Sequence, residues 1–200
     1  MTRKWIFISA VLLATLSACT QEQEGERDYT PLSKGSRWEY TVKALSPVFT
    51  RYEGTAETLI TGKETIQGKE YYKFVTEYEG VANLKQTVSY FRKGPDGYYR
   101  IGGKEKDKPE TLMIPFPHSL GQKWIAEAPG GDMNCTLETF ATVNVPGGKF
   151  KKCLGISYKG TGSLEGNIYY APGVGRVKDA YKEIGGWEID FRLKYYFIAK

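Results

Sequence analysis

The segment Trp187–Tyr195 reads Trp-Glu-Ile-Asp-Phe-Arg-Leu-Lys-Tyr, and it decides the fold class. Apolar or aromatic side chains occupy its odd positions, and charged side chains occupy its even positions. Successive side chains of a β-strand point to opposite sides, so this period of two puts the apolar groups on one face and the charges on the other. An antiparallel sheet with one face on a core and one face in water has this pattern.

The rest of the chain repeats the strand pattern between turn residues. Trp38, Tyr40 and Val42 alternate with polar side chains in the same way. Further strands are predicted at residues 51–61, 70–78, 86–93, 98–101, 111–114, 133–145, 149–158, 167–170 and 176–181. Beyond residue 18, no window of ten residues keeps the apolar spacing of a helix. The sequence therefore predicts an all-β fold with little helix, either an antiparallel β-barrel or a strongly curved half-barrel sheet, of about ten strands.

A short motif, P-x-S-x-G-x-[RK]-W, occurs twice in the chain. Its defining residues are Pro31, Gly35 and Trp38 in the first copy and Pro117, Gly121 and Trp124 in the second. Proline fixes φ, glycine accepts a left-handed conformation, and tryptophan opens a strand by burying a large ring. We expect both tryptophans to be buried at strand starts. The repeat has two explanations that stay open: a duplicated half-domain, or one local turn used twice.

The N-terminal segment Met1–Cys19 has the character of a secretory signal peptide. Two basic residues, Arg3 and Lys4, precede an apolar run from Trp5 to Leu16, and small residues follow. This order of charge, apolar core and small residues is typical of an export signal. The apolar run is shorter than the ~20 residues that a membrane-spanning helix needs.

The tetrapeptide Leu16-Ser17-Ala18-Cys19 resembles the lipobox of bacterial lipoproteins. The resemblance implies cleavage before Cys19 and diacylglycerol on its sulfur, which would tether the protein to a membrane. Thr20, rather than Asp, follows the cysteine. In Gram-negative lipoproteins that this protein resembles, that choice implies the outer membrane, on the side that faces the periplasm.

These segments divide the chain into a signal peptide (1–18), a lipidated cysteine with a flexible tether (19–29) and a single β domain (30–200). Residues 20–28 read TQEQEGERD and contain no apolar residue, which is typical of disorder. Cleavage leaves 182 residues, enough for one domain with a real core. The mature part keeps 26 of the 28 basic and all 23 acidic residues, so its net charge is +3. A balance this mild does not indicate a nucleic-acid partner.

Two arguments about Cys135 and Cys153 point in opposite directions. With Cys19 lipidated, they form an even pair in an exported, oxidising compartment, which favours a disulfide. A hairpin turn centred on Gly147 would instead set Cys153 opposite Ala141, leaving Cys135 six residues along the strand, ~20 Å away. The chemistry of the compartment leads us to predict the disulfide, and the strand register opposes it.

Three segments give the chain a family resemblance. They are Tyr29–Tyr40, Val145–Cys153 and Ala171–Lys178, which fit the patterns Y-x-P-L-x-x-G-x-x-W-x-Y (with Thr30 as the residue before Pro31), V-P-x-G-x-F-x-x-C and A-P-G-V-G-x-V-K. Together they resemble a set of bacterial envelope lipoproteins that have no assigned reaction. The resemblance implies a β fold and an envelope location. A looser likeness, in architecture alone, is to the half-barrel carriers that move lipoproteins through the periplasm.

No residue pattern indicates catalysis, a metal or a cofactor. His118 is the single histidine, so we expect a turn residue rather than a metal ligand. Four Tyr-Tyr pairs should each place one ring in the core and one outside, as cross-strand packing or as a ligand-stacking surface. They begin at Tyr71, Tyr98, Tyr169 and Tyr195.

The sequence therefore predicts a membrane-anchored envelope lipoprotein that is not an enzyme. We expect a binding module for an apolar ligand or for another envelope protein. The alternative is a structural or assembly accessory without a small ligand. A solvent-connected cavity lined by aromatic residues would favour ligand binding, and a barrel filled by side chains would favour the accessory role.

Overall fold

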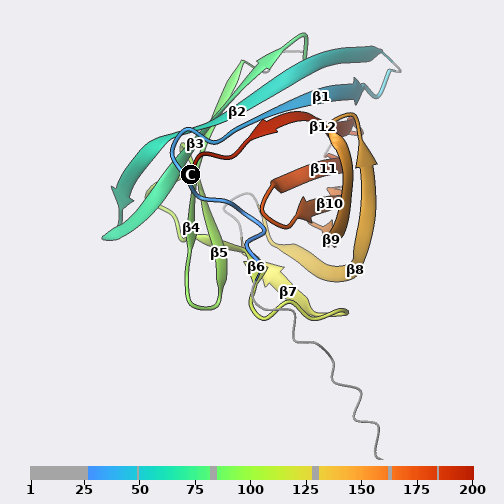
Figure 1. The fold of residues 1–200 in the computed structure, drawn as a ribbon. Coiled ribbons are helices and arrows are strands. Elements are labelled where there is room, and N and C mark those ends of the chain that lie inside the picture. Colours follow the sequence, from blue (N-terminus) through green and yellow to red (C-terminus); the bar gives the residue numbers. More distant parts are fainter. Residues whose placement is uncertain (1–26, 49, 82–84, 128–130, 162–163, 184) are drawn as a thin grey trace, which may run out of the picture.

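The computed structural model describes residues 27–48, 50–81, 85–127, 131–161, 164–183 and 185–200. The predicted signal peptide, the lipobox and Cys19 lie outside the described residues. The described chain forms twelve strands (Figure 1): β1 (Arg37–Leu45), β2 (Arg51–Ile66), β3 (Lys69–Glu79), β4 (Gln86–Lys93), β5 (Gly97–Gly102), β6 (Thr111–Pro115), β7 (Lys123–Ala126), β8 (Met133–Val145), β9 (Gly148–Lys159), β10 (Glu165–Ala171), β11 (Gly175–Lys182) and β12 (Glu188–Phe197). None of these ranges contains a helix that could cross a membrane.

All twelve strands belong to one antiparallel sheet. Its strand order is β6-β5-β4-β3-β2-β1-β12-β11-β10-β9-β8-β7, so the pairing of β1 with β12 joins two six-stranded halves. The two edge strands, β6 and β7, close the sheet without strand pairing. Thr111 Oγ1 at the start of β6 donates to the carbonyl of Glu127, just after β7, over 2.6 Å. We call this junction the seam. The prediction of an all-β, strongly curved antiparallel sheet is confirmed, with twelve strands in a nearly closed barrel.

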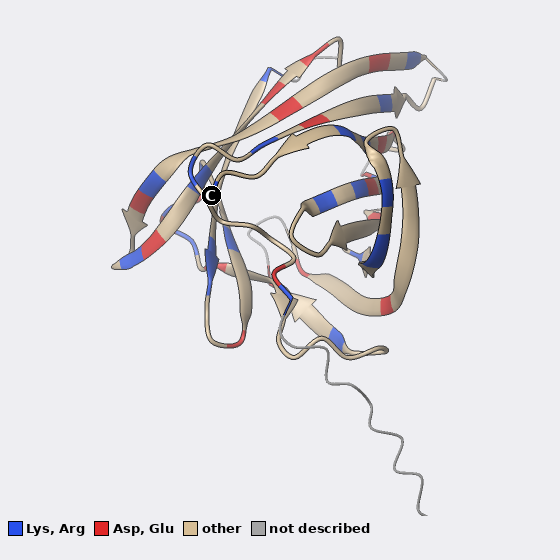
Figure 2. Cartoon of the chain, in the orientation of Figure 1, with Lys and Arg blue, Asp and Glu red and all other residues tan. Residues whose placement is uncertain are grey.

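Charge is distributed along the strands as the period of two requires. In β12 the residues Ile189, Phe191 and Leu193 are buried, whereas Glu188, Arg192 and Lys194 on the other face are exposed. Figure 2 shows acidic and basic residues interspersed along the strands, with neither sign confined to one part of the sheet. The core lies on the inner side of the barrel, where the apolar members of β1 pack against those of β12 and β11.

The first motif copy forms a turn that is hydrogen-bonded to the neighbouring strand. Gly35 has φ +92°, and its N–H donates to the carbonyl of Ile60 in β2 over 2.8 Å. The N–H of Ser36 closes the turn on Ser33 O (3.1 Å), and Ile60 N–H donates to Ser36 O (3.0 Å). Only the left-handed conformation of Gly35 lets the chain make this turn and still lie beside β2.

The second motif copy repeats this arrangement bond for bond. Gly121 has φ +78°, and its N–H donates to Leu137 O in β8 over 2.8 Å. Gln122 N–H closes the turn on Ser119 O (3.0 Å), and Leu137 N–H donates to Gln122 O (2.9 Å). Each copy thus opens one six-stranded half and binds the second strand of that half. If the motif were only a local turn that occurs twice, the two copies would not need to bond to the equivalent strand in each half. The shared bonding pattern therefore favours duplication of a half-domain.

The two motif tryptophans differ in burial. Trp38 is 3% exposed, stacks on Phe74 and donates through Nε1 to Val174 O over 2.6 Å. Trp124 also stands at a strand start, but it is only half-buried. The prediction is confirmed for Trp38, and full burial of Trp124 was wrong. The physical reason is that β7 is an edge strand paired only with β8, so its ring is covered on fewer sides.

The predicted disulfide was wrong. Cys135 and Cys153 are both buried free thiols, and they belong to different core clusters. Cys153 is paired with Ala141 across the hairpin, as the turn at Pro146-Gly147 requires. A bulge at Lys152, with φ +56°, turns Cys153 into the core instead of towards water. The strand register therefore separates the thiols along β8.

The ordered domain begins before residue 30. Tyr29 is 1% exposed, and its ring meets His118 edge-on at 5.1 Å. The Asp28 Oδ1 atom accepts hydrogen bonds from Tyr98 OH (2.6 Å) and Thr30 N–H (3.0 Å). The segment 19–29 was assigned to the tether, but its last two residues belong to the barrel. The polar composition of this segment predicted disorder, because the sequence does not show that Tyr98, 70 residues away, binds the Asp28 carboxylate.

Three of the four Tyr-Tyr pairs follow the strand alternation. Tyr71, Tyr98 and Tyr170 are buried, and the neighbouring member of each pair is half-buried. In the fourth pair, Tyr195 and Tyr196 are both exposed, because β12 ends there beside the start of β1. Cross-strand packing therefore accounts for three pairs.

Candidate functional site

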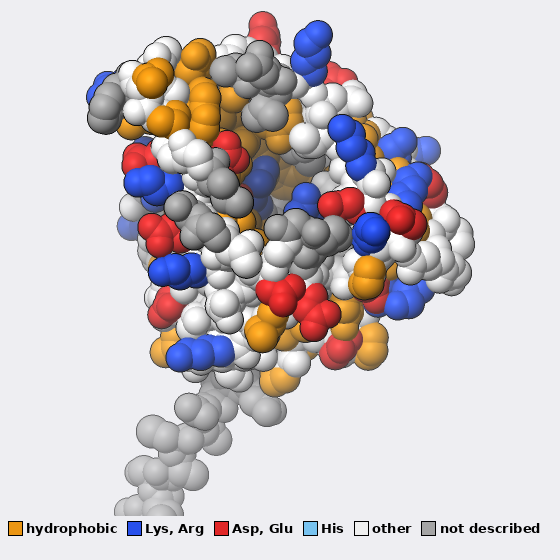
Figure 3. Space-filling model, turned by 180° about the vertical axis from the view of Figure 1, so that it is seen from behind, with side chains coloured by type: hydrophobic (Ala, Val, Ile, Leu, Met, Phe, Trp, Pro, Cys, Tyr) orange, Lys and Arg blue, Asp and Glu red, His pale blue; other side chains and the backbone are white. Residues whose placement is uncertain are grey.

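The interior of the barrel contains a cavity of about 380 Å³. Each of the twelve strands contributes at least one residue to its wall, so the site depends on the whole sheet and not on a single loop. Figure 3 shows a hollow on this side of the molecule, with hydrophobic side chains in its wall and basic side chains inside it. The barrel is thus not filled by its own side chains.

Most of the cavity wall is aromatic or otherwise apolar. Phe74 and Phe91 contact each other at 4.7 Å between ring centres, and Trp38 stacks on Phe74 at 5.9 Å. Met113 from β6 and Met133 from β8 line the cavity close to the seam. Methionine side chains are flexible and polarisable, so this part of the wall adapts to the shape of an apolar group.

A band of hydroxyl groups crosses the apolar wall on β2, β3 and β4. Thr58 and Thr76 share a hydrogen bond of 2.8 Å between their Oγ1 atoms, and Tyr78 OH lies 3.3 Å from Thr87 Oγ1. These residues line the cavity together with Ser89. The wall is therefore apolar with a small number of placed polar groups, which is typical of small-molecule sites.

An ion pair between the half-buried Arg176 and the buried Asp179 lies at the β11 side of the cavity. Arg176 Nη1 is 3.3 Å from Asp179 Oδ2, and Tyr158 OH donates to Asp179 Oδ1 over 3.1 Å. The Arg176 guanidinium carbon lies over the ring of Tyr40 at 4.8 Å and over the ring of Phe191 at 5.1 Å. Two aromatic faces thus fix the position of the cation, an arrangement that also stabilises its charge.

The electrostatics of this pair follow from burial. Burial raises the pKa of the Asp179 carboxyl, and the nearby Arg176 charge opposes that rise. Burial and the negative charge of Asp179 raise the pKa of Tyr158, so its hydroxyl stays protonated and remains a donor. Asp179 is thus engaged by two partners that lie within the protein.

Arg100 brings a second cation to the same cavity from the opposite half of the barrel. It lies on β5, and its side chain is exposed. Among the described residues that line the cavity, Arg100 and Arg176 are the basic members and Asp179 is the acidic member. The wall therefore carries an excess of positive charge, which favours an anionic group inside.

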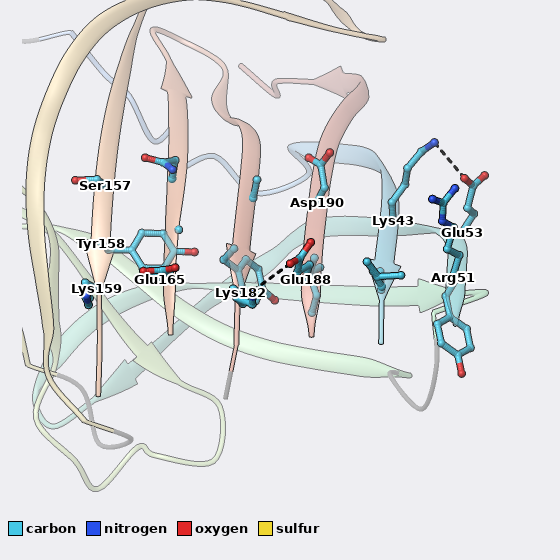
Figure 4. Close-up of a pocket in the computed structure, with 18 of the residues that line it drawn as sticks. Lys43, Arg51, Glu53, Ser157, Tyr158, Lys159, Glu165, Lys182, Glu188 and Asp190 are labelled. Carbon is cyan, nitrogen blue, oxygen red and sulfur yellow. Dashed lines mark ion pairs between the residues drawn. The ribbon is translucent and has the colours of Figure 1, made fainter. Parts of the chain in front are cut away.

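A larger depression of about 910 Å³ lies over β8–β12, β1 and β2 and is lined largely by polar and charged residues. In Figure 4, Lys43 and Glu53 point toward each other, and their ion pair measures 3.1 Å; Lys182 and Glu188 form another at 3.2 Å. These charges neutralise each other across neighbouring strands, as on any wet sheet face. The smaller interior cavity is therefore the better candidate for a ligand site.

Of the residues that the sequence singled out, Pro31, Trp38 and Cys135 line the cavity, whereas Gly35, Pro117, Gly121, Trp124, Cys153 and His118 do not. His118 packs against Tyr29 and Phe116, and its Nδ1 lies 3.1 Å from Pro115 O, which confirms a turn residue. Cys135 lines the cavity, but burial raises the pKa of both thiols to about 11, so neither is an active nucleophile at neutral pH.

Sequence reasoning missed Arg100, Arg176 and Asp179. Residues three apart in a regular strand face opposite sides of the sheet, so Arg176 and Asp179 did not suggest a pair. A register shift in β10, where Tyr169 pairs with Lys178 and Tyr170 with Arg176, puts an extra residue into β11. This bulge brings both side chains to the interior.

Comparison with known proteins gives the fold alone. No protein-family model and no curated sequence matches the chain. The structure is similar to that of a protein from Bacteroides fragilis, described as predicted to be exported and as having a YmcC-like fold. The identity is 12%, the TM-score is 0.53, and the match covers 86% of this chain and 100% of that one. A predicted lipoprotein from Parabacteroides distasonis matches with a TM-score of 0.46 and 11% identity, over 86% of this chain and 99% of that one. The chain shares the fold of the B. fragilis protein.

Proposed function

We propose that this protein is a lipid-anchored binding protein of the bacterial cell envelope. Its barrel would hold a small, largely apolar ligand and carry out no reaction on it. The observation that carries the proposal is the interior cavity of about 380 Å³, with its aromatic and methionine wall. Ligand sites in proteins measure ~300–1,000 Å³ and combine an apolar wall with a few polar groups, so the cavity lies at the small end of that range.

The chemistry of the wall supports binding without catalysis. Nucleophilic catalysis needs an ionisable nucleophile next to a base. The thiol of Cys135 has a raised pKa, and His118 lies outside the cavity wall. Arg176, Asp179 and Tyr158 are engaged with one another, which positions them as fixed charges and donors rather than as proton carriers.

The location rests on the sequence of the N-terminus. The lipobox-like Leu16–Cys19 supports a lipid on Cys19, and Thr20 supports the outer membrane, on the periplasmic side. The description of the B. fragilis protein of the same fold as exported agrees with an envelope location. In this position the barrel would take its ligand from the periplasm or from the membrane surface.

The binding role is tested with a neutral fluorescent probe, N-phenyl-1-naphthylamine, whose emission rises in an apolar site. The titration uses the full chain. We expect saturable binding that Ser89→Phe abolishes, because Ser89 lines the cavity. Thr41→Phe is the matched control, since Thr41 lies on the outer face of β1 between two buried residues. If the two variants bind equally, or if no probe binds, the accessory role without a small ligand is correct.

A further inference from the structure

We infer that the ligand of the interior cavity is a single-chain amphiphile with an anionic head group, bound head-first by Arg176 and Arg100. This inference rests on the proposed function, because it assigns the chemistry of the ligand to the same cavity. Such an amphiphile differs from a general apolar ligand in one measurable respect. The charge of its head group should control the affinity.

The Arg176 guanidinium lies at the cavity wall in a fixed position. Its carbon is held 4.8 Å from the centre of the Tyr40 ring and 5.1 Å from that of Phe191, and Nη1 lies 3.3 Å from Asp179. A guanidinium has five N–H donors in a planar fork; Asp179 accepts from Nη1, and the Tyr40 hydroxyl is a second side-chain partner of this guanidinium. Among the described residues, no second carboxylate lines the cavity to occupy the rest. Asp179 and Tyr40 do not account for all five donors, so Arg176 can also bind an anion in the cavity that it lines.

Positive charge reaches the cavity from both halves of the barrel. Arg176 belongs to β11 and Arg100 to β5, yet both line the same cavity. Asp179 is bound by Arg176 and by the hydroxyl of Tyr158, and the charge of Arg100 also acts on it, but its single negative charge cannot balance two arginines. Two like charges around one cavity repel each other, and an anion placed between them removes that repulsion.

The wall also has a large apolar part beside its two arginines. Phe74, Phe91, Met113, Met133 and Ile168 line the cavity, and none of them carries a charge. An ion without an apolar part would leave this surface uncovered, whereas an alkyl chain would bury it. The volume of about 380 Å³ is at the small end of ligand sites and suits one chain rather than the two chains of a phospholipid.

The test compares three probes with the same chain: dodecanoate, dodecyl phosphate and dodecanol, all below the concentrations at which they aggregate. We expect at least one of the two anions to bind about tenfold or more tightly than the alcohol, because a charge-assisted hydrogen bond to arginine contributes about that factor. The ratio between dodecanoate and dodecyl phosphate shows whether the natural head is a carboxylate or a phosphate. Equal affinity for the anions and the alcohol would overturn the inference.

Variants separate this inference from the proposed function. Arg100→Met should lower the affinity for the preferred anion about tenfold and leave dodecanol unchanged, because Arg100 is exposed and its loss leaves no buried partner. Arg51→Met is the matched control, since Arg51 lies on the outer face at the start of β2. If Arg100→Met and Arg51→Met behave alike, the head-group assignment is wrong. If N-phenyl-1-naphthylamine also fails to bind the unmodified protein, the proposed function itself is wrong.

Discussion

Replacing Glu110 with glutamine should destabilise the protein strongly at neutral pH and only weakly in acid. Glu110 lies just before β6, and its side chain is 15% exposed. Its Oε2 accepts from Arg92 Nε over 2.7 Å, and its Oε1 accepts from Lys69 Nζ over 2.6 Å. Tyr71 OH also donates to Oε2. This cluster ties the edge strand at the seam to β3 and β4.

The magnitude follows from the pKa of the carboxyl. Burial alone would raise the pKa of Glu110, but hydrogen bonds from Arg92, Lys69 and Tyr71 outweigh burial and hold it at about 2, below the ordinary 4.5. A depressed pKa means that the folded state gains stability wherever the carboxyl is ionised. The gain is complete above pH 4.5 and is lost as the pH falls towards 2. This shift corresponds to about 3 kcal/mol at pH 7 and about 1 kcal/mol at pH 3.

Urea denaturation of the protein and of Glu110→Gln at pH 7 and pH 3 measures the effect. We expect the difference in unfolding free energy between the two to shrink by about 2 kcal/mol from pH 7 to pH 3. Glu70→Gln is the control, because Glu70 forms an exposed ion pair with Lys63 and should change little at either pH. A difference for Glu110→Gln that is the same at both pH values would refute the electrostatic reasoning.

Three further predictions concern other parts of the chain. Trp38→Ala should cost about 3–5 kcal/mol of unfolding free energy and Trp124→Ala clearly less, because only Trp38 is fully buried; chemical denaturation of both checks this. Without reductant, Cys135 and Cys153 should resist alkylation in the native protein and should both be alkylated in denaturant, as mass spectrometry would show; a single oxidised species would contradict the free thiols. Cys19→Ala should leave the protein unprocessed or free of the membrane in cell fractions, and a variant that still matures and stays membrane-bound would disprove the lipid anchor.

The strands could be predicted from the sequence because each shows a local alternation of apolar and polar residues, one kind on each face. Trp187–Tyr195 showed a core face and a wet face, and β12 was found there. The turn at Pro146-Gly147 likewise fixed the partner of Cys153 as Ala141, which the structure confirms. The disulfide prediction failed because the chemistry of the compartment was given more weight than this register. Oxidising conditions permit a bond only where two sulfurs can meet.

The cavity could not be predicted in the same way, because its charges depend on a defect in the strand pattern. Period-two reasoning assigns Arg176 and Asp179 to opposite faces, and only the bulge between β10 and β11 brings them to one side. Arg100 joins them from a strand 76 positions earlier, a proximity that no local pattern encodes.

The bulge places Arg176 and Asp179 inside the barrel, and their presence there is better explained by ligand binding than by stability. Burying an ion pair stabilises a fold less than apolar packing does, so Arg176 and Asp179 are a poor choice if stability alone is the purpose. Replacing both with apolar residues of similar size, as in Arg176→Met with Asp179→Leu, should therefore leave the unfolding free energy unchanged or higher. The same double variant should lose the preference for anionic over neutral twelve-carbon probes. Loss of folding in the double variant would mean that the pair serves the structure of the barrel and not its ligand.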